Sequence, residues 1–203
     1  MYDFTVPMAL MDFVPVFLFG AAAVLLQRDL YNKMPKYSFA CFAAGTINVF
    51  IAGLLKALWK LLYAAGICDF QVFNTMFLPT QSIGFLLAGL GIVIMFFGKK
   101  SAALAVAPPL FRGTMLFIPM MVFGLAAITV SLSVLAFRLK KKGAAVLFVL
   151  NLIFCMGMGY LASRDSAGAA MNWIEQGVNC FGQAFLLWGA LILHKAGLRE
   201  MKL

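Results

Sequence analysis

Long apolar segments take up most of this chain and constrain its fold more than any other feature. A membrane-spanning helix needs about 20 apolar residues. Six segments of that size or longer follow one another, at residues 5–26, 37–65, 74–98, 114–137, 143–163 and 171–194. Charged residues make up only 11% of the chain, which excludes an ordinary water-soluble domain, where about a quarter are charged. We therefore predict an all-α integral membrane protein that contacts the lipid bilayer.

The basic residues test whether a shorter apolar stretch, residues 101–113, also crosses the membrane. Positive charge gathers on the cytoplasmic side of membrane proteins. Six crossings would split the Lys and Arg clusters evenly between the two sides, whereas a seventh leaves only Arg112 and Arg164 outside. Seven transmembrane helices therefore fit better, in the plasma or bacterial inner membrane, with the N-terminus outside and the C-terminus cytoplasmic. A helix of this length rises only about 20 Å, whereas the hydrocarbon core of a membrane is about 30 Å thick. The helix must therefore extend into the flanking residues or cross a locally thinned part of the membrane.

An internal repeat supports the seventh crossing. The pattern F-[VI]-P-x-x-x-F-G-x-A-A occurs at residues 13–23 and again at 117–127, an offset of 104. A shorter match pairs residues 85–89 with 185–189, at an offset of 100. Basic residues follow both copies of the first pattern, so the two copies point the same way through the membrane. Parallel repeats of three helices need one extra crossing between them.

The repeat predicts a single membrane domain of two parallel three-helix bundles, residues 1–98 and 114–203, joined by a short linker helix at 99–113. Each bundle opens with a helix that carries a matched proline, Pro15 or Pro119. Proline kinks a helix because it has no N–H to bond the carbonyl four residues earlier. We expect these prolines to form a shared hinge. Simple kinks, tolerated where neighbouring helices satisfy the backbone, are the alternative.

This arrangement, with a proline in the first helix of each repeat, resembles the SWEET and PQ-loop transporters. Residues 54–63 are similar to the second helix of that family, which carries a tryptophan, here Trp59. Asn74 and either Asn172 or Asn179 stand where the family often places polar residues. The chain departs from the family in having no Pro-Gln dipeptide. The resemblance implies a transporter fold and adds Trp59 to the candidate ligand-binding residues.

Four ionisable residues lie inside the predicted helices, where a charge is costly unless it is paired or hydrated. They are Asp12 in the first helix, Lys56 and Lys60 in the second, and Glu175 in the last. The seven-helix topology places all four in the outer half of the membrane. Two cations and two anions at a similar depth predict mutual pairing around an outward-facing cavity. The alternative for the two lysines is that they extend to the outer headgroups.

Amide side chains add to the predicted cavity. The last helix carries four of them on one face, at spacings of four, three and four: Asn172, Gln176, Asn179 and Gln183. Their donors and acceptors suit a hydroxylated or amide-bearing ligand, although contacts between helices are an alternative use. We place Asn179 and Gln183 among the candidate ligand-binding residues. If the third helix starts near Asn74, so that Pro79 kinks it, Gln81 faces inward at a depth comparable with Asp12, and we expect it to line the cavity; the alternative is that Pro79 lies in the first turn.

The sequence offers few ligands for a metal or a redox cofactor. One histidine, four dispersed cysteines and no C-x-x-C motif are too few for structural zinc, an iron–sulfur cluster or bis-histidine haem. We expect no metal and no cofactor. The net charge of +9 comes mainly from basic residues that flank the helices, so we expect no nucleic-acid partner. His194, at the cytoplasmic end of the last helix, is predicted to be solvated.

These observations favour a transporter of a small polar or anionic solute. In this hypothesis Asp12 or Glu175 carries a coupling proton and Lys56 attracts an anionic group. A seven-helix receptor without transport is the first alternative; a retinal-binding form is disfavoured because no lysine lies between Trp173 and His194. A lipid-modifying enzyme is the second, but no histidine lies near the two carboxylates, so we assign no catalytic residue. The identity of the solute and the presence of a homo-oligomer stay open.

Overall fold

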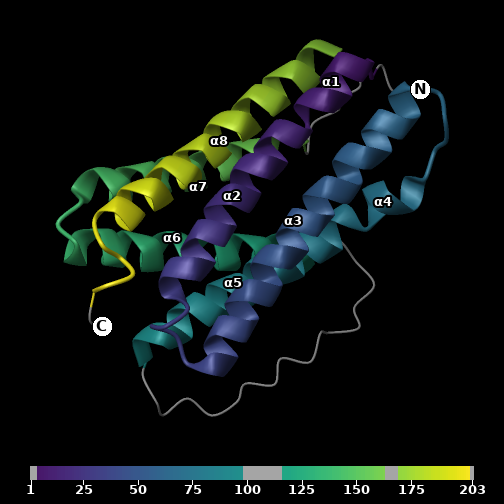
Figure 1. Ribbon diagram of the computed structural model, residues 1–203. Helices are drawn as coiled ribbons and strands as arrows, with labels where there is room; N and C mark the ends of the chain where they lie inside the picture. The colour runs from purple at the N-terminus through teal and green to yellow at the C-terminus, as the bar shows by residue number, and fades with distance from the viewer. Residues whose placement is uncertain (1–3, 98–115, 163–168, 202–203) are drawn as a thin grey trace.

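The computed structural model describes residues 4–97, 116–162 and 169–201. Within these ranges the chain forms helices and no strands (Figure 1). The helices are α1 (Val6–Met11), α2 (Phe13–Leu30), α3 (Lys36–Ala64), α4 (Gln71–Thr75), α5 (Phe77–Phe97), α6 (Phe117–Arg138), α7 (Lys142–Ala162) and α8 (Ala169–Lys195). They make six spans that are long and apolar enough to cross a membrane, because α1 with α2 and α4 with α5 each count as one. The six predicted apolar segments are thus confirmed as helices of an integral membrane protein, and the predicted linker helix at 99–113 lies outside the described residues.

Two of the spans are interrupted near one end, each four residues before a proline. Helix α1 ends at Met11, whose carbonyl would accept a hydrogen bond from residue 15 in a continuous helix. Pro15 has no N–H to donate, so the helix breaks there and Asp12 lies at the break. Helix α4 ends at Thr75, which has the same relation to Pro79. Local proline chemistry therefore sets where Asp12 lies in the first span.

Pro119, which the repeat matches to Pro15, has a different setting. It lies in the first turn of α6, where backbone N–H groups have no partner inside the helix, so a proline costs little there. Its side chain is exposed, whereas that of Pro15 is buried. The shared hinge stays a prediction.

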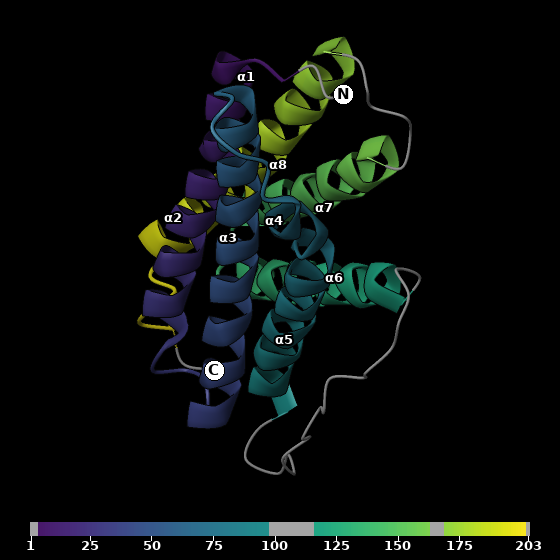
Figure 2. The ribbon, with the colours of Figure 1, turned by 90° about the vertical axis from the view of Figure 1, so that its right-hand side faces the viewer.

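The six spans pack in a closed ring that follows the chain. Helix α2 packs on α3, α3 on α5, α5 on α6, α6 on α7, α7 on α8, and α8 returns to α2. Figure 2 shows the same helices turned by 90°, with α5 crossing α6 beside α3. The pairs α3–α5 and α7–α8 make the most extensive contacts within each half of the ring. The first and last spans are therefore neighbours.

Helices α5 and α6 run in the same direction although they are consecutive spans. Gly124, near the start of α6, meets the backbone of Phe85, and the Arg138 guanidinium at its end lies 5.6 Å from the centre of the Phe96 ring. Residue numbers thus rise together along the interface. In Figure 1 both helices run toward the left side of the view.

Helices α8 and α2 form the second parallel interface. Gln176 donates a hydrogen bond to the Met8 carbonyl at one end, and His194 contacts Asp29 at the other. The pairs α2–α3, α3–α5 and α7–α8 run antiparallel. Helices α6 and α7 also run antiparallel, because they are in contact and only a short turn separates Arg138 from Lys142. The ring therefore consists of two groups of three helices, α2–α3–α5 and α6–α7–α8, with the same order and the same directions.

Glycines allow α3, α5 and α6 to approach at backbone distance. A β-carbon added at Gly124 would lie 2.3 Å from the carbonyl carbon and oxygen of Phe85, and one at Gly45 would lie 2.3 Å from the Ala88 backbone nitrogen. Ser38, on α3, donates a 2.6 Å hydrogen bond to the Gly91 carbonyl of α5. Close approach of small residues is the main source of helix association in lipid, where apolar side chains gain nothing by leaving lipid tails.

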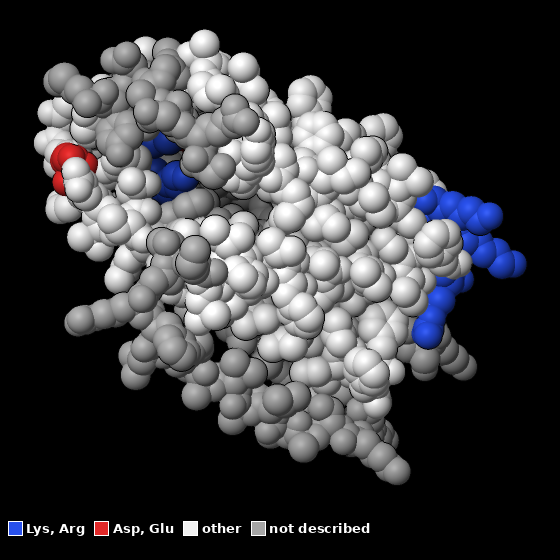
Figure 3. All heavy atoms as spheres, turned by 180° about the vertical axis from the view of Figure 1, so that it is seen from behind, with Lys and Arg blue, Asp and Glu red and all other residues white. Residues whose placement is uncertain are grey.

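Basic residues gather at one end of the bundle, which we call the basic end (Figure 3). They lie in the last turns of α2, α6 and α8 or shortly after them, and within the described ranges they are Arg28, Lys33, Lys36, Arg138, Lys140, Lys141, Lys142, Lys195 and Arg199. Lys33 lies in the turn between α2 and α3 and donates a hydrogen bond to the Met201 carbonyl. Burial lowers the pKa of the Lys33 ammonium, and the nearby Asp29 carboxylate partly opposes that change.

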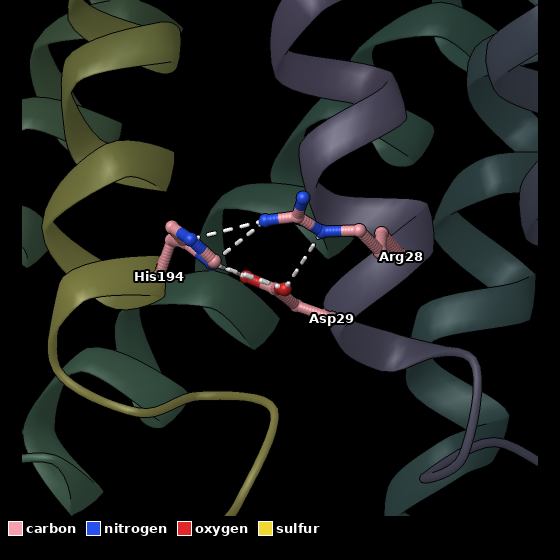
Figure 4. Close-up of polar contacts among 3 residues, drawn as sticks. All are labelled: Arg28, Asp29 and His194. Atoms are coloured by element: carbon pink, nitrogen blue, oxygen red, sulfur yellow. Dashed lines mark hydrogen bonds and ion pairs between the residues drawn. The ribbon is translucent and has the colours of Figure 1, made fainter.

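A polar cluster at the basic end joins α2 to α8 (Figure 4). The Asp29 side chain is only 1% exposed, and its Oδ2 atom lies 2.9 Å from Nδ1 of His194. Arg28 approaches both partners, with Nη2 3.0 Å from Nε2 of His194 and Nε 3.7 Å from Oδ1 of Asp29. The prediction of a solvated His194 was therefore wrong in one respect, because the ring is partly exposed but contacts a buried carboxylate.

Candidate functional site

All six spans contribute to one cavity of about 540 Å³, in the half of the bundle away from the basic end. Its lining comes from the starts of α2, α5, α6 and α8 and the ends of α3 and α7. Figure 3 shows a hollow on this side of the molecule, with Lys or Arg atoms inside it. The cavity therefore lies at the centre of the ring and touches both three-helix groups.

Seven of the eight predicted ligand-binding residues line this cavity. They are Asp12, Lys56, Lys60, Gln81, Glu175, Asn179 and Gln183. They come from four different spans, the charged residues and Gln81 predicted from similar depth and Asn179 and Gln183 from the shared amide face of the last helix. Their role in ligand binding stays a prediction.

Trp59, the eighth predicted residue, does not line the cavity. Its side chain is 2% exposed and its Nε1 donates a 2.8 Å hydrogen bond to Oδ1 of Asp69, in the turn after α3. Its ring lies 5.8 Å from the ring of Phe4 and 6.0 Å from that of Tyr63. Consecutive residues on a helix point about 100° apart, so Trp59 and Lys60 face different surroundings. In this structure Trp59 packs the end of α3 against the first described residues.

An ion pair joins the first two spans inside the cavity. The Lys60 ammonium lies 2.8 Å from Oδ2 of Asp12, and the side chains are 10% and 17% exposed. The ammonium also lies 5.0 Å from the centre of the Phe4 ring. Because Asp12 lies at the break between α1 and α2, the kink caused by Pro15 places this carboxylate where Lys60 can reach it. The pair has no net charge.

The other two charges in the cavity have no such pairing. The Lys56 ammonium lies 4.1 Å above the centre of the Phe77 ring, and no carboxylate of the described residues is within ion-pair distance of it. Glu175 is 8% exposed, and its Oε1 atom has no hydrogen-bond partner in the described part of the chain. Among the described residues, the cavity thus contains one unpaired ammonium, on α3, and one unpaired carboxylate, on α8.

Two amides of α8 leave further acceptors unsatisfied. Gln176 uses its Nε2 to donate a 2.9 Å hydrogen bond to the Met8 carbonyl, and Gln183 uses its Nε2 on Oδ1 of Asn179 at 3.4 Å. The Oε1 atoms of both glutamines are buried and have no partner among the described residues. Buried polar atoms in proteins are almost always hydrogen-bonded to protein or water. These oxygens therefore require donors from water or from a ligand.

The opposite wall of the cavity is mostly apolar. It comes from helices α6 and α7, through Ile118, Met121, Val122, Leu125, Met156 and Met158. Methionine side chains are flexible and polarizable, so they fit ligands of different shapes. The cavity is thus amphipathic, with charged and amide groups on α2, α3, α5 and α8 and methionines on α6 and α7.

Sequence reasoning missed some of this site. Gln176 was predicted only as one of four amides on a face, yet it lines the cavity and bonds α1. Asn172, predicted on the same face, is buried but does not line the cavity, and it has a partner of its own. The methionine wall was not predicted, because an apolar residue that faces a cavity has the same character as one that faces lipid.

No group of three or more His, Cys, Asp or Glu residues in the described ranges could hold a metal ion. The four cysteines are free, and Cys155 lies on the cavity wall, 3.8 Å from Nε2 of Gln183. What the cavity offers chemically is recognition by charge, by amide hydrogen bonds and by apolar contact.

No family model matches this sequence, and the comparisons with curated proteins and with solved structures find no similar protein. The resemblance to the SWEET and PQ-loop transporters therefore stays a prediction. The site is described by its own geometry alone.

Proposed function

We propose that this protein transports a small polar solute across the membrane and binds it in the cavity between the two three-helix groups. The observation that carries the proposal is the pair of unpaired charges, Lys56 and Glu175, held in one cavity of a membrane protein. Charges at such positions are costly, and in membrane proteins they typically mark substrate or ion pathways. Binding of a solute would provide an interaction partner for both the Lys56 ammonium and the Glu175 carboxylate.

The arrangement of the ring supports a transporter rather than a fixed scaffold. We infer that the two three-helix groups are parallel repeats, because the repeated pattern starts at Phe13, the first residue of α2, and at Phe117, the first residue of α6. Among the described residues, the two groups meet mainly at the parallel interfaces α5–α6 and α8–α2. Rocking of one group against the other about these interfaces would expose a central cavity to each side in turn.

Because α5 and α6 are consecutive spans that run in the same direction, the chain between them must return across the membrane, which supports a seventh crossing by residues 101–113. The excess of basic residues supports a cytoplasmic location for the basic end. Labelling with a membrane-impermeant maleimide tests this topology in a background that has its four native cysteines replaced by alanine. We expect Gly113→Cys to be labelled in intact cells, as is Ala65→Cys at the end of α3. Gly143→Cys, at the basic end, should be labelled only after lysis. Labelling of Gly113→Cys only after lysis would remove both the seventh crossing and the parallel repeat.

Uptake into proteoliposomes tests the function itself. We expect at least one class in a panel of amino acids, sugars, organic acids and nucleosides to be taken up. Glu175→Gln and Lys56→Met should each lower this uptake by about tenfold or more, because each removes a charge from the cavity. Glu200→Gln is the matched control, since Glu200 is exposed at the basic end.

Absence of uptake for the whole panel, with the protein shown to be folded, would contradict transport. A cavity that opens to only one side in every state would then identify a receptor that binds the solute without moving it.

A further inference from the structure

We propose that the solute is a zwitterion, with an ammonium group, a carboxylate and an apolar body, as in an apolar amino acid. This inference rests on the proposed function, because it names the substrate class of the same cavity. It follows from which charges and hydrogen-bonding atoms are left unpaired.

The charge balance of the cavity favours a neutral solute with two charges. Asp12 and Lys60 neutralise each other at 2.8 Å, which leaves Lys56 and Glu175. An anionic solute would pair with Lys56 but leave the Glu175 carboxylate buried and unpaired. A cationic solute would pair with Glu175 but leave the Lys56 ammonium buried and unpaired. Leaving a buried charge without a partner is strongly unfavourable. A zwitterion pairs with both residues and leaves the cavity neutral.

The hydrogen-bonding atoms of α8 fit the ammonium end. On α8, three buried oxygens lack donors among the described residues, namely Oε1 of Glu175, of Gln176 and of Gln183. An ammonium group offers three donors and no acceptor. Gln176 is fixed in this role, because its Nε2 is already used on the Met8 carbonyl at 2.9 Å. Helix α8 therefore presents a set of acceptors that a primary ammonium can satisfy.

The opposite side of the cavity fits the carboxylate end and the apolar body. Lys56 on α3 and the Gln81 amide on α5 supply donors for a carboxylate. The methionines of α6 and α7, Met121, Met156 and Met158, supply an adaptable apolar wall. A cavity of about 540 Å³ is of the size that proteins use for small organic ligands.

The test compares each zwitterion with analogues that lack one charge. The purified full-length chain is placed in phosphatidylglycerol nanodiscs, and ligand binding is measured by isothermal titration calorimetry. The probes are leucine, methionine and phenylalanine, each with its deaminated acid and its decarboxylated amine. We expect at least one amino acid to bind about tenfold or more tightly than both of its analogues. Equal or tighter binding of an acid or an amine for all three sets would overturn the proposal.

Two variants assign the ends of the ligand. Lys56→Met should remove the preference for the amino acid over its amine, while the preference over its acid remains. Glu175→Gln should remove the preference for the amino acid over its acid, while the preference over its amine remains. Lys56→Arg keeps the positive charge and should keep both preferences. A variant that weakens all three ligands of a set equally would contradict this assignment, and the wild-type comparison still decides the proposal if a variant does not fold.

A phosphatidylethanolamine headgroup also carries an ammonium and an anion, so the lipid is varied as well. A free solute predicts the same affinity in nanodiscs with and without phosphatidylethanolamine. Weaker amino-acid binding in its presence would assign the site to the headgroup instead.

The two proposals fail in different ways. Binding of an amino acid without uptake into proteoliposomes removes transport and keeps the zwitterion site. Uptake of a sugar or an organic acid that depends on Lys56 and Glu175 keeps transport and removes the zwitterion.

Discussion

Gly124→Ala is expected to destabilise this protein by about 3 kcal/mol, an unusually large effect for one added methyl group. The new β-carbon would lie 2.3 Å from the backbone of Phe85, and backbone atoms cannot rotate away as a flexible side chain can. Helices α5 and α6 would have to separate, which removes contacts along their whole interface. The midpoint of thermal unfolding in detergent measures this effect.

Gly157→Ala is the matched control, since Gly157 is also a helical glycine but no atom lies within 4 Å of its added β-carbon. Alanine is a better helix former than glycine by roughly 0.5–1 kcal/mol, so this variant should be neutral or slightly more stable. Equal stability of Gly124→Ala and Gly157→Ala would contradict the close packing of α5 against α6.

Lys60→Met is the second substitution with a large expected effect. It leaves the Asp12 carboxylate, 17% exposed, without its ammonium partner, and breaking such a pair in a buried site costs about 3–5 kcal/mol. Water in the cavity lowers that cost, so we expect a loss near the lower limit. The free energy of unfolding measures it.

The double variant Asp12→Asn with Lys60→Met should be more stable than Lys60→Met alone, because it removes the stranded charge. Lys56→Met is the matched control, as Lys56 has no carboxylate partner among the described residues. Strictly additive effects of Asp12→Asn and Lys60→Met would show that the two residues are not coupled.

The sequence was most informative where the bilayer imposes strict rules. Backbone groups in lipid must be bonded within the span, so an apolar segment of sufficient length is a helix, and all six predicted segments are helices. The same rule makes charges rare inside spans. Asp12, Lys56, Lys60 and Glu175 were therefore visible as a group, and similar depth was enough to predict that they lie near one another.

The sequence was least informative about rotation of each helix about its axis. Lipid tails and a protein interior are similarly apolar, so the sequence pattern does not show whether Met121 and Met156 face the cavity or the lipid. Trp59 became a candidate through the resemblance to the SWEET and PQ-loop transporters, but a helix turns about 100° from Trp59 to Lys60, so the two adjacent side chains diverge. The contact between Asp29 and His194 joins residues 165 positions apart, and no local pattern predicts it.

The closed ring has a consequence for how the protein is made. Of the six described spans, α8 leaves the ribosome after the other five, and it packs against α2, which leaves before them. Until it arrives, the Asp29 carboxylate has no His194 to contact and the cavity has no α8 wall. A chain that stops before α8 therefore keeps the ion pair between Arg28 and Asp29 but lacks the contact to His194 and the side of the cavity that α8 supplies.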